Sequence, residues 1–349
     1  MKTSFYQYSF KALTNLLLEN HLSPTGASLL YNWHYKQKQI EPCTHNLAIS
    51  TQIFIREHLS FFLPEIVDID QSKDQTVKFL MQMEDGLQVE TVLIHFQNKY
   101  TICLSAQVGC AMDCSFCFTG TQGLKRHLKV DEIIGQFIMA AHWLRIHRPQ
   151  DPPLKNIVYM GQGEPLHNFD AVKISNEIFL DQHGASIGIQ KITLSTAGYL
   201  PGLVRWNEEM PRVNIALSLH SPFEEKRNKL IPINRRYPLA EVLKYIDLIP
   251  LHKKQYIIYE YLLIKNYNDT EIDAHATGEL LKGKMAIVNL ISFNPFPGSK
   301  YERPDSTQVL KFQTILESYH LPVLVRARKG SDILAACGQL NTKRQNITG

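Results

Sequence analysis

Strand-like runs alternate with amphipathic helices from about residue 86 onward. The clearest helix has apolar residues at helical spacing from Val130 to Leu144, with Asp131 and Glu132 in its first turn, where the helix dipole favours acidic groups. Such alternation is typical of parallel strands joined by helical crossovers, so the sequence predicts an α/β fold with a barrel-like body. The predicted strands span residues 89–94, 100–104, 156–160, 192–195, 213–219, 256–264, 286–292 and 323–326.

Several of these strands end in polar or glycine-containing loops. In parallel α/β barrels the loops that follow the strands form the active-site face, so we expect these loops to converge. They span residues 161–165, 195–198, 218–221 and 292–295.

The sequence pattern divides the chain into three parts. Residues 1–85 show helical apolar spacing between polar turns and predict a small helical domain, followed by the barrel at 86–300 and a C-terminal extension at 301–349. The segment 30–38 mixes aromatic with basic residues. That mixture can stack on nucleic-acid bases and hold phosphates, but aromatic residues at helical spacing are equally typical of a core, so both interpretations stay open.

Cys110, Cys114 and Cys117 are separated by three and then two residues, between a strand-like segment and a loop. Three thiolates at this spacing can hold three irons of a four-iron, four-sulfur cluster and leave the fourth iron open to a small ligand. Zinc is the alternative, because short cysteine spacings also mark zinc sites and structural zinc needs four closed ligands. Cys103 and His127 are the nearest further donors, but neither completes a second close cysteine pair. The sequence therefore favours the cluster.

Composition limits the compartment and the partners. Six cysteines in 349 residues are too few and too unevenly placed for a secreted disulfide framework, and no apolar run is long enough to span a membrane, so we expect a cytoplasmic protein. A net charge of +4 is only a weak lean toward polyanions. Short basic runs could contact phosphates, although most such runs are simply solvated. They lie at 125–127, 226–227, 235–236, 253–254 and 326–329.

Phe116, immediately before the third cysteine, completes a pattern that resembles radical S-adenosylmethionine (SAM) enzymes. In that family SAM binds the open iron, and one-electron reduction cleaves it to a 5′-deoxyadenosyl radical. The chain as a whole resembles the radical-SAM RNA adenine methyltransferases, most loosely at its N-terminal end. The motifs that carry the resemblance are Val-Glu-Thr-Val at 89–92, the cysteine run, Gly-Gln-Gly-Glu-Pro at 161–165, Leu-Ser-Thr-Ala-Gly at 194–198, Leu-Ser-Leu-His-Ser-Pro at 217–222, Asn-Leu-Ile-Ser-Phe-Asn-Pro at 289–295 and Ala-Ala-Cys-Gly-Gln-Leu at 335–340.

The resemblance implies a partial (β/α)6 radical-SAM barrel with an N-terminal helical domain that binds RNA and a C-terminal extension that carries a reactive cysteine. It implies that Cys110, Cys114 and Cys117 hold the cluster. The residue types themselves also suit a cluster-bound SAM: Gly161 and Gly163 let the backbone approach the cofactor closely, and the carboxylate of Glu164 suits its cationic part. The residues implied to contact SAM are Gly163, Glu164, Ser195, Ser218, Leu219, His220 and Asn294.

The resemblance also implies a route to a carbon that is not nucleophilic. One SAM methylates Cys337, and a second gives the radical that removes hydrogen from this S-methyl group, so that the resulting methylene adds to adenine. Cys103 then attacks the sulfur of Cys337 and releases the RNA, leaving a disulfide bond that needs reduction. Glu90 stands where the family has a general base, although an exposed strand carboxylate is the simpler interpretation.

The expected substrate is carbon 2 of an adenine in large-subunit ribosomal RNA, and possible substrates include transfer RNA. A monomer that takes electrons from a donor such as flavodoxin or ferredoxin is expected. The alternatives are methylation of adenine carbon 8, as in the antibiotic-resistance relatives, and a non-catalytic metal-binding RNA module. Cys103 and Cys337 favour catalysis, because a binding module has no need of them. The chain departs from the usual family pattern at Gln162, at Phe118 and over 329–334.

Overall fold

The computed structural model describes residues 2–43, 46–251 and 255–342. The N-terminal region contains three short helices and a small parallel pair of strands. Its core is aromatic: Phe5, Tyr6, Tyr31 and Tyr35 are fully buried. Most of the aromatic residues in the segment 30–38 therefore serve packing. The elements are β1 (Thr3–Ser4), α1 (Phe10–Glu19), α2 (Thr25–Tyr31), α3 (Ile49–His58) and β2 (Leu59–Ser60).

The prediction of a helical domain as far as residue 85 is wrong for residues 59–85. Here the chain forms strands β3 (Glu65–Gln71) and β4 (Val77–Gln82), which pair with each other antiparallel. In β4 every second residue is buried, beginning with Val77, which is the two-residue period of a strand with one face against a core. Helical structure in this region therefore ends at His58.

One ten-stranded sheet runs through the rest of the molecule, in the order β14-β13-β12-β11-β10-β9-β6-β5-β4-β3. Seven neighbouring strands of this sheet pair in parallel, in the order β6, β9, β10, β11, β12, β13 and β14. The pairs β3–β4, β4–β5 and β5–β6 are antiparallel. The strands are β5 (Gln88–Phe96), β6 (Lys99–Cys103), β9 (Leu154–Tyr159), β10 (Ile192–Thr196), β11 (Asn214–Ser218), β12 (Ile257–Leu263), β13 (Ala286–Ser292) and β14 (Val323–Val325).

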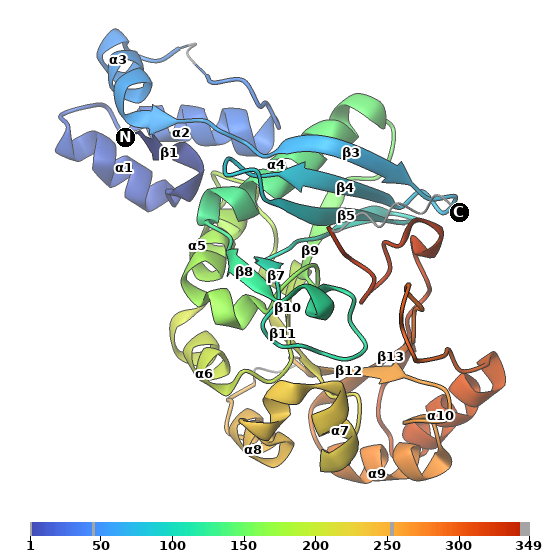
Figure 1. Ribbon diagram of the computed structural model, residues 1–349. Helices are drawn as coiled ribbons and strands as arrows, with labels where there is room; N and C mark the ends of the chain where they lie inside the picture. Colours follow the sequence, from blue (N-terminus) through green and yellow to red (C-terminus); the bar gives the residue numbers. More distant parts are fainter. Residues whose placement is uncertain (1, 44–45, 252–254, 343–349) are drawn as a thin grey trace.

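A helix follows each of the first six parallel strands, and Figure 1 shows these helices on the outer side of the curved sheet. This confirms the predicted α/β fold with a partial (β/α)6 barrel, to which β14 adds a further parallel strand. The helices are α4 (Val130–His147), α5 (Phe169–Leu180), α6 (Leu200–Glu209), α7 (Glu224–Leu230), α8 (Leu239–Asp247), α9 (Glu271–Leu281) and α10 (Ser306–Ser318).

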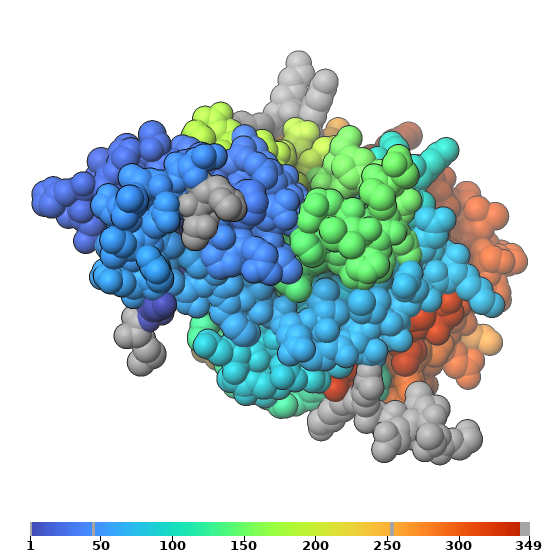
Figure 2. All heavy atoms as spheres, turned by 90° about the horizontal axis from the view of Figure 1, so that it is seen from above, coloured from blue at the N-terminus to red at the C-terminus, as the bar shows by residue number. Residues whose placement is uncertain are grey.

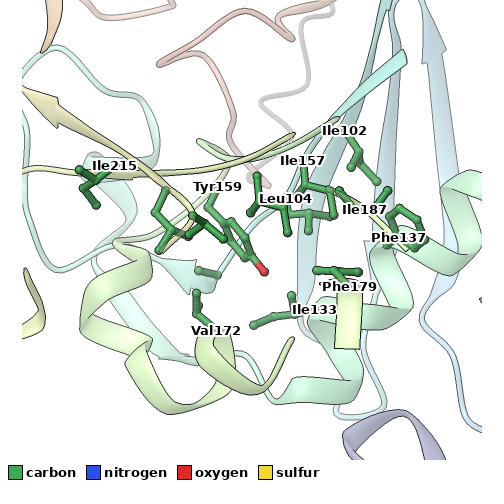
Figure 3. Close-up of a cluster of buried hydrophobic side chains, with 14 of the residues drawn as sticks. Ile102, Leu104, Ile133, Phe137, Ile157, Tyr159, Val172, Phe179, Ile187 and Ile215 are labelled. Atoms are coloured by element: carbon green, nitrogen blue, oxygen red, sulfur yellow. The ribbon is translucent and has the colours of Figure 1, made fainter. Parts of the chain in front are cut away.

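The main core lies between the sheet and its covering helices. Ile102, Ile157, Phe137 and Phe179 are fully or almost fully buried there, from two strands and from α4 and α5 (Figure 3). The N-terminal region lies beside α4 (Figure 2), where the carbonyl oxygen of Lys38 is 2.9 Å from His142 Nδ1. No helix in the described part of the chain is long and apolar enough to cross a membrane.

Candidate active site

The cysteine loop is held by a small antiparallel pair of strands, β7 (Gln107–Gly109) and β8 (Leu124–His127), on the inner side of the sheet (Figure 1). The base of this loop is tight. Gly109 has a φ of +77°, and a Cβ atom there would stand 1.8 Å from the carbonyl oxygen of Gly123. Only glycine allows the two ends of the loop to approach this closely.

The three cysteines of the loop line one cavity at the carboxyl ends of the parallel strands, which we call the cluster cavity. The four loops predicted to converge all contribute to this lining: those after β9, β10 and β11, and the loop after β13 through Phe293, although Asn294 itself does not line it. The lining includes Cys110, Cys114, Cys117, Gly163, Glu164, Ser195, Ser218, His220, Glu260 and Cys337.

Burial keeps the three cysteine thiols protonated when no metal is bound. It raises the pKa of Cys110 to about 12, and it raises the pKa values of Cys114 and Cys117 as well. Iron bound to these sulfurs would favour the thiolates, since metal binding releases thiol protons. Within residues 2–43, 46–251 and 255–342, no group of three His, Cys, Asp or Glu side chains is placed so that it could hold a single metal ion. A four-iron cluster makes no such demand, because each cysteine binds a different iron.

Glu164 carries a buried carboxylate on the wall of the cluster cavity. Its oxygens accept hydrogen bonds from the backbone N–H groups of Ala197 (2.8 Å) and Leu166 (3.2 Å). Burial outweighs these bonds and raises the pKa of Glu164 to about 7. A cationic group such as the ammonium of SAM would compensate this carboxylate, so the cavity fits the predicted cofactor.

His220 is buried and uncharged in the same cavity. Burial, followed by the positive charge of Arg227, lowers its pKa to about 3. The N–H of Leu262 donates to His220 Nδ1 at 3.1 Å, so the ring proton is on Nε2. The ring packs edge-on against Phe116 of the cysteine loop, 4.7 Å between centroids. His220 therefore offers a neutral hydrogen-bond donor to a ligand.

Leu219 and Asn294 lie outside the lining of the cluster cavity. The side chain of Leu219 belongs to the hydrophobic core, and its N–H and C=O bond to Glu260 and Arg227. Asn294 instead holds the segment of Cys337, because its Nδ2 donates to the carbonyl oxygen of Cys337 at 3.2 Å. Direct contact of either residue with SAM stays a prediction.

Cys337 stands where two cavities meet. It lines the cluster cavity, and it also lines a second cavity, the thiol cavity, together with Cys103. Its side chain is accessible from these cavities, but protein surrounds the cavities themselves. This burial raises the pKa of the Cys337 thiol, and the positive charge of Arg326 opposes the shift. Burial, reinforced by nearby Cys337, raises the pKa of Cys103 too. Both are free thiols, so the structure does not support the predicted disulfide bond as a link of the resting protein.

Glu90 lies in a third cavity, the Glu90 cavity, with Lys78 and Phe118. Its exposed-strand interpretation is wrong, since only 5% of the residue is exposed. Lys78 Nζ is 3.1 Å from one carboxylate oxygen, and the N–H of Asn341 donates to the other at 2.7 Å. Burial nevertheless raises the pKa of Glu90, which suits a group that takes up a proton.

Comparison with known proteins agrees with this geometry. Residues 104–277 match the model of the radical SAM superfamily. A probable dual-specificity RNA methyltransferase RlmN from Dictyoglomus thermophilum is 40% identical over 90% of this chain and 89% of its own, and that of Syntrophus aciditrophicus is 38% identical over 93% and 94%. A crystal structure of a radical SAM methyltransferase from Sphaerobacter thermophilus superposes with a TM-score of 0.89, 34% identical, over 97% of this chain and 99% of that one. The chain belongs to the RlmN family of radical SAM RNA methyltransferases.

Membership of the RlmN family confirms the resemblance found in the sequence, and with it a methyltransferase that uses a four-iron, four-sulfur cluster and SAM. The zinc alternative and the non-catalytic binding module are not favoured by these relatives.

Two charged residues of the site were not among those predicted from the sequence. Glu260, in the middle of β12, lines the cluster cavity and has one oxygen without a hydrogen-bond partner. A lone charge inside the apolar run Ile-Ile-Tyr-Glu-Tyr-Leu-Leu was a usable signal. Arg227 is fully buried in α7 and donates to the carbonyl oxygens of Ala197, Ser218 and Leu219, so it joins the ends of β10 and β11. Its run of basic residues gave no sign of this role.

Proposed function

We propose that this chain methylates carbon 2 of an adenine in large-subunit ribosomal RNA, and in transfer RNA as well, by way of a methyl group carried on Cys337. The observation that carries the proposal is the place of Cys337. It lines the cavity of the three loop cysteines and also the cavity that contains Cys103. One sulfur therefore faces both the cofactor side and the side of the second thiol.

In this proposal Cys110, Cys114 and Cys117 are the cluster ligands, and Gly163, Glu164, Ser195, Ser218 and His220 surround SAM. When bound, the cluster and SAM supply a methyl group and a 5′-deoxyadenosyl radical. Glu164 binds the ammonium, and the Nε2–H of His220 donates to a ligand acceptor. Leu219 and Asn294 contribute through the backbone and through the position of Cys337.

The chain's own residues then carry the methyl group across. Adenine carbon 2 is electron-poor, so the Cys337 sulfur takes the methyl group first. The radical that bound SAM would supply removes one hydrogen atom from this S-methyl group, the remaining methylene carbon bonds to carbon 2, and the adduct would return one electron to the cluster. Glu90 removes the proton from carbon 2. The thiolate of Cys103 attacks the Cys337 sulfur, and the carbon–sulfur bond breaks with its electron pair left on the adenine side. The methylene carbon takes up a proton and becomes the methyl group of the product, and a Cys103–Cys337 disulfide remains until an external thiol reduces it.

The thiol cavity offers the charge that RNA needs. Arg303, Arg326, Arg328 and Lys329 line it. In two of the other basic runs a basic side chain is already engaged: Arg126 bonds to Asp85 and Glu132, and Lys226 bonds to Asp273. The run 253–254 lies outside the described residues. RNA phosphates therefore bind at the thiol cavity in this proposal, on a cytoplasmic monomer that receives electrons from flavodoxin or ferredoxin.

The test is an anaerobic reaction with SAM, a reductant and either ribosomal or transfer RNA, followed by nucleoside mass spectrometry. We expect 2-methyladenosine from both RNAs, and no product from Cys337→Ala. Cys43→Ala is the matched control, because Cys43 is a buried cysteine outside the three cavities and should leave the product unchanged. Formation of 8-methyladenosine, or full turnover by Cys337→Ala, contradicts the proposal.

A further inference from the structure

A basic surface pocket lies beside the cysteine loop, away from the three cavities described above. It has a volume of about 570 Å³ and is formed by the segments after β11, β12 and β13. Lys229, Arg235, Lys265 and Lys300 line it and are exposed. Its single acidic lining residue, Glu302, is 3.6 Å from Lys265. The pocket therefore carries a net positive charge.

This positive charge is largely unpaired. Lys229, Arg235 and Lys300 have no carboxylate within 4.0 Å in the described ranges. Two tyrosines also line the pocket: the ring centroids of Tyr267 and Tyr301 lie 5.8 Å apart, with the ring planes inclined by 63°. Aromatic side chains among exposed cationic groups suit an acidic protein surface.

The pocket touches the loop that holds the cluster. Ser115, between the second and third cysteines, is exposed, and its hydroxyl is 2.9 Å from that of Tyr301. The N–H of Ser115 donates to the carbonyl oxygen of Leu230, the neighbour of Lys229. One group of buried hydrophobic residues, which includes Met112 and Leu230, packs against Tyr267 and Tyr301 of the pocket and also against Cys110 and Cys114 of the loop. The pocket is therefore an external face of the cluster site.

We propose that a small acidic electron-transfer protein docks on this basic pocket and delivers one electron to the cluster past Ser115. In this step the reduced donor loses one electron and the cluster gains it, and no bond is made or broken. Protein pairs that exchange electrons use small, polar contacts, and opposite charges speed their encounter. The inference rests on the proposed function only in needing a reducible cluster at Cys110, Cys114 and Cys117.

RNA is the other polyanion that a basic pocket can bind. None of the residues that line the basic pocket also lines the cluster, thiol or Glu90 cavity. A base that reaches Cys337 and Cys103 thus does not pass through it. The position against the cluster loop and the separation from both reactive thiols favour the electron donor.

The test uses the cluster-loaded full chain and follows cluster reduction by its visible absorbance in anaerobic stopped flow. Reduced flavodoxin is the acidic donor, and photoreduced 5-deazariboflavin is a small uncharged reductant. For the double variant Lys229→Glu and Lys300→Glu, we expect at least a tenfold slower reduction by flavodoxin at low salt, and a lost dependence of this rate on ionic strength. Reduction by deazariboflavin should stay at the wild-type rate. The neutral pair Lys229→Gln and Lys300→Gln should give an intermediate loss.

Lys155→Glu is the matched control, because Lys155 is an exposed lysine in β9 outside the pocket. It should leave both rates unchanged. An unchanged rate with flavodoxin in the charge-reversed variant overturns the inference, and so does an equal loss with both reductants, which means damage to the cluster. If the flavodoxin rate is unchanged and the affinity for transfer RNA falls, the pocket binds RNA instead. Because the readout is cluster reduction, failure here is distinct from failure to methylate adenine.

Discussion

Glu164→Gln should stabilise the cofactor-free protein at alkaline pH and weaken SAM binding at the same time. Burial moves the pKa of this carboxyl from 4.5 to about 7, so the folded state binds its proton more tightly than the unfolded state. Stability contributed by this group is therefore lost as pH rises from 4.5 to 7. By proton linkage the loss is about 0.8 kcal/mol at pH 5 and about 3.3 kcal/mol at pH 8, a difference of about 2.5 kcal/mol.

Glutamine removes this loss because it has no proton to release. It keeps one backbone hydrogen bond and presents an NH₂ group to the second donor, which costs about 1 kcal/mol at either pH. The variant should therefore be about equal to wild type at pH 5 and about 2 kcal/mol more stable at pH 8. Urea unfolding of the cofactor-free protein at both pH values measures this. Calorimetric titration with SAM should show at least a thirtyfold weaker affinity at pH 8, because the buried ammonium loses its carboxylate partner.

Glu57→Gln is the control, since Glu57 is an exposed glutamate in α3. Its unfolding free energy should follow wild type at both pH values. If the stability difference between Glu164→Gln and wild type is the same at pH 5 and at pH 8, the carboxylate does not carry the burial cost described here. If SAM affinity is unchanged, Glu164 does not bind the ammonium.

Further outcomes follow from other residues. Cys103→Ala should accumulate a covalent protein–RNA adduct on denaturing gels, and a variant that turns over without adduct contradicts its resolving role. Glu90→Gln should still be methylated at Cys337, as seen by intact-protein mass spectrometry, but should release at least a hundredfold less methylated RNA. Arg227→Met should lower the unfolding free energy by about 3 kcal/mol or more, because buried carbonyl oxygens at the ends of β10 and β11 lose their donor. Ile157→Ala should cost about 2–5 kcal/mol in the core shown in Figure 3, whereas Ile189→Ala, at a residue 42% exposed, should cost less than 1 kcal/mol.

The parallel strands could be predicted to within about two residues, because each is a short apolar run followed by a polar loop, as at 286–292. Strands β3 and β4 lie inside the region predicted to be helical, because their alternating residues directly follow segments with a true helical pattern. The difference is one of period: Val77, Phe79 and Met81 are buried in β4, with partly exposed residues between them. A two-residue repeat was the correct interpretation.

The site itself was predictable where sequence motifs specify it and not where tertiary contacts do. The loop cysteines, Glu164 and His220 stand in local patterns, and the fold brings them to one cavity. Asn294 also stands in such a pattern, but its side chain bonds to the backbone of Cys337. Arg326 lowers the pKa values of Cys103 and Cys337 against the effect of burial only because β14 lies beside β13, which no local pattern reveals.

The position of Cys337 between two cavities has a kinetic consequence. If Cys337 carries the methyl group as proposed, it can receive that group from the cluster cavity while no RNA is bound, because this route does not pass through the thiol cavity. The protein would then store one methyl equivalent ahead of its substrate. A sample of the protein can be pre-loaded with SAM that carries an isotope-labelled methyl group and then gel-filtered. When this sample is mixed with RNA and unlabelled SAM, the first methylated base should still carry the undiluted isotope.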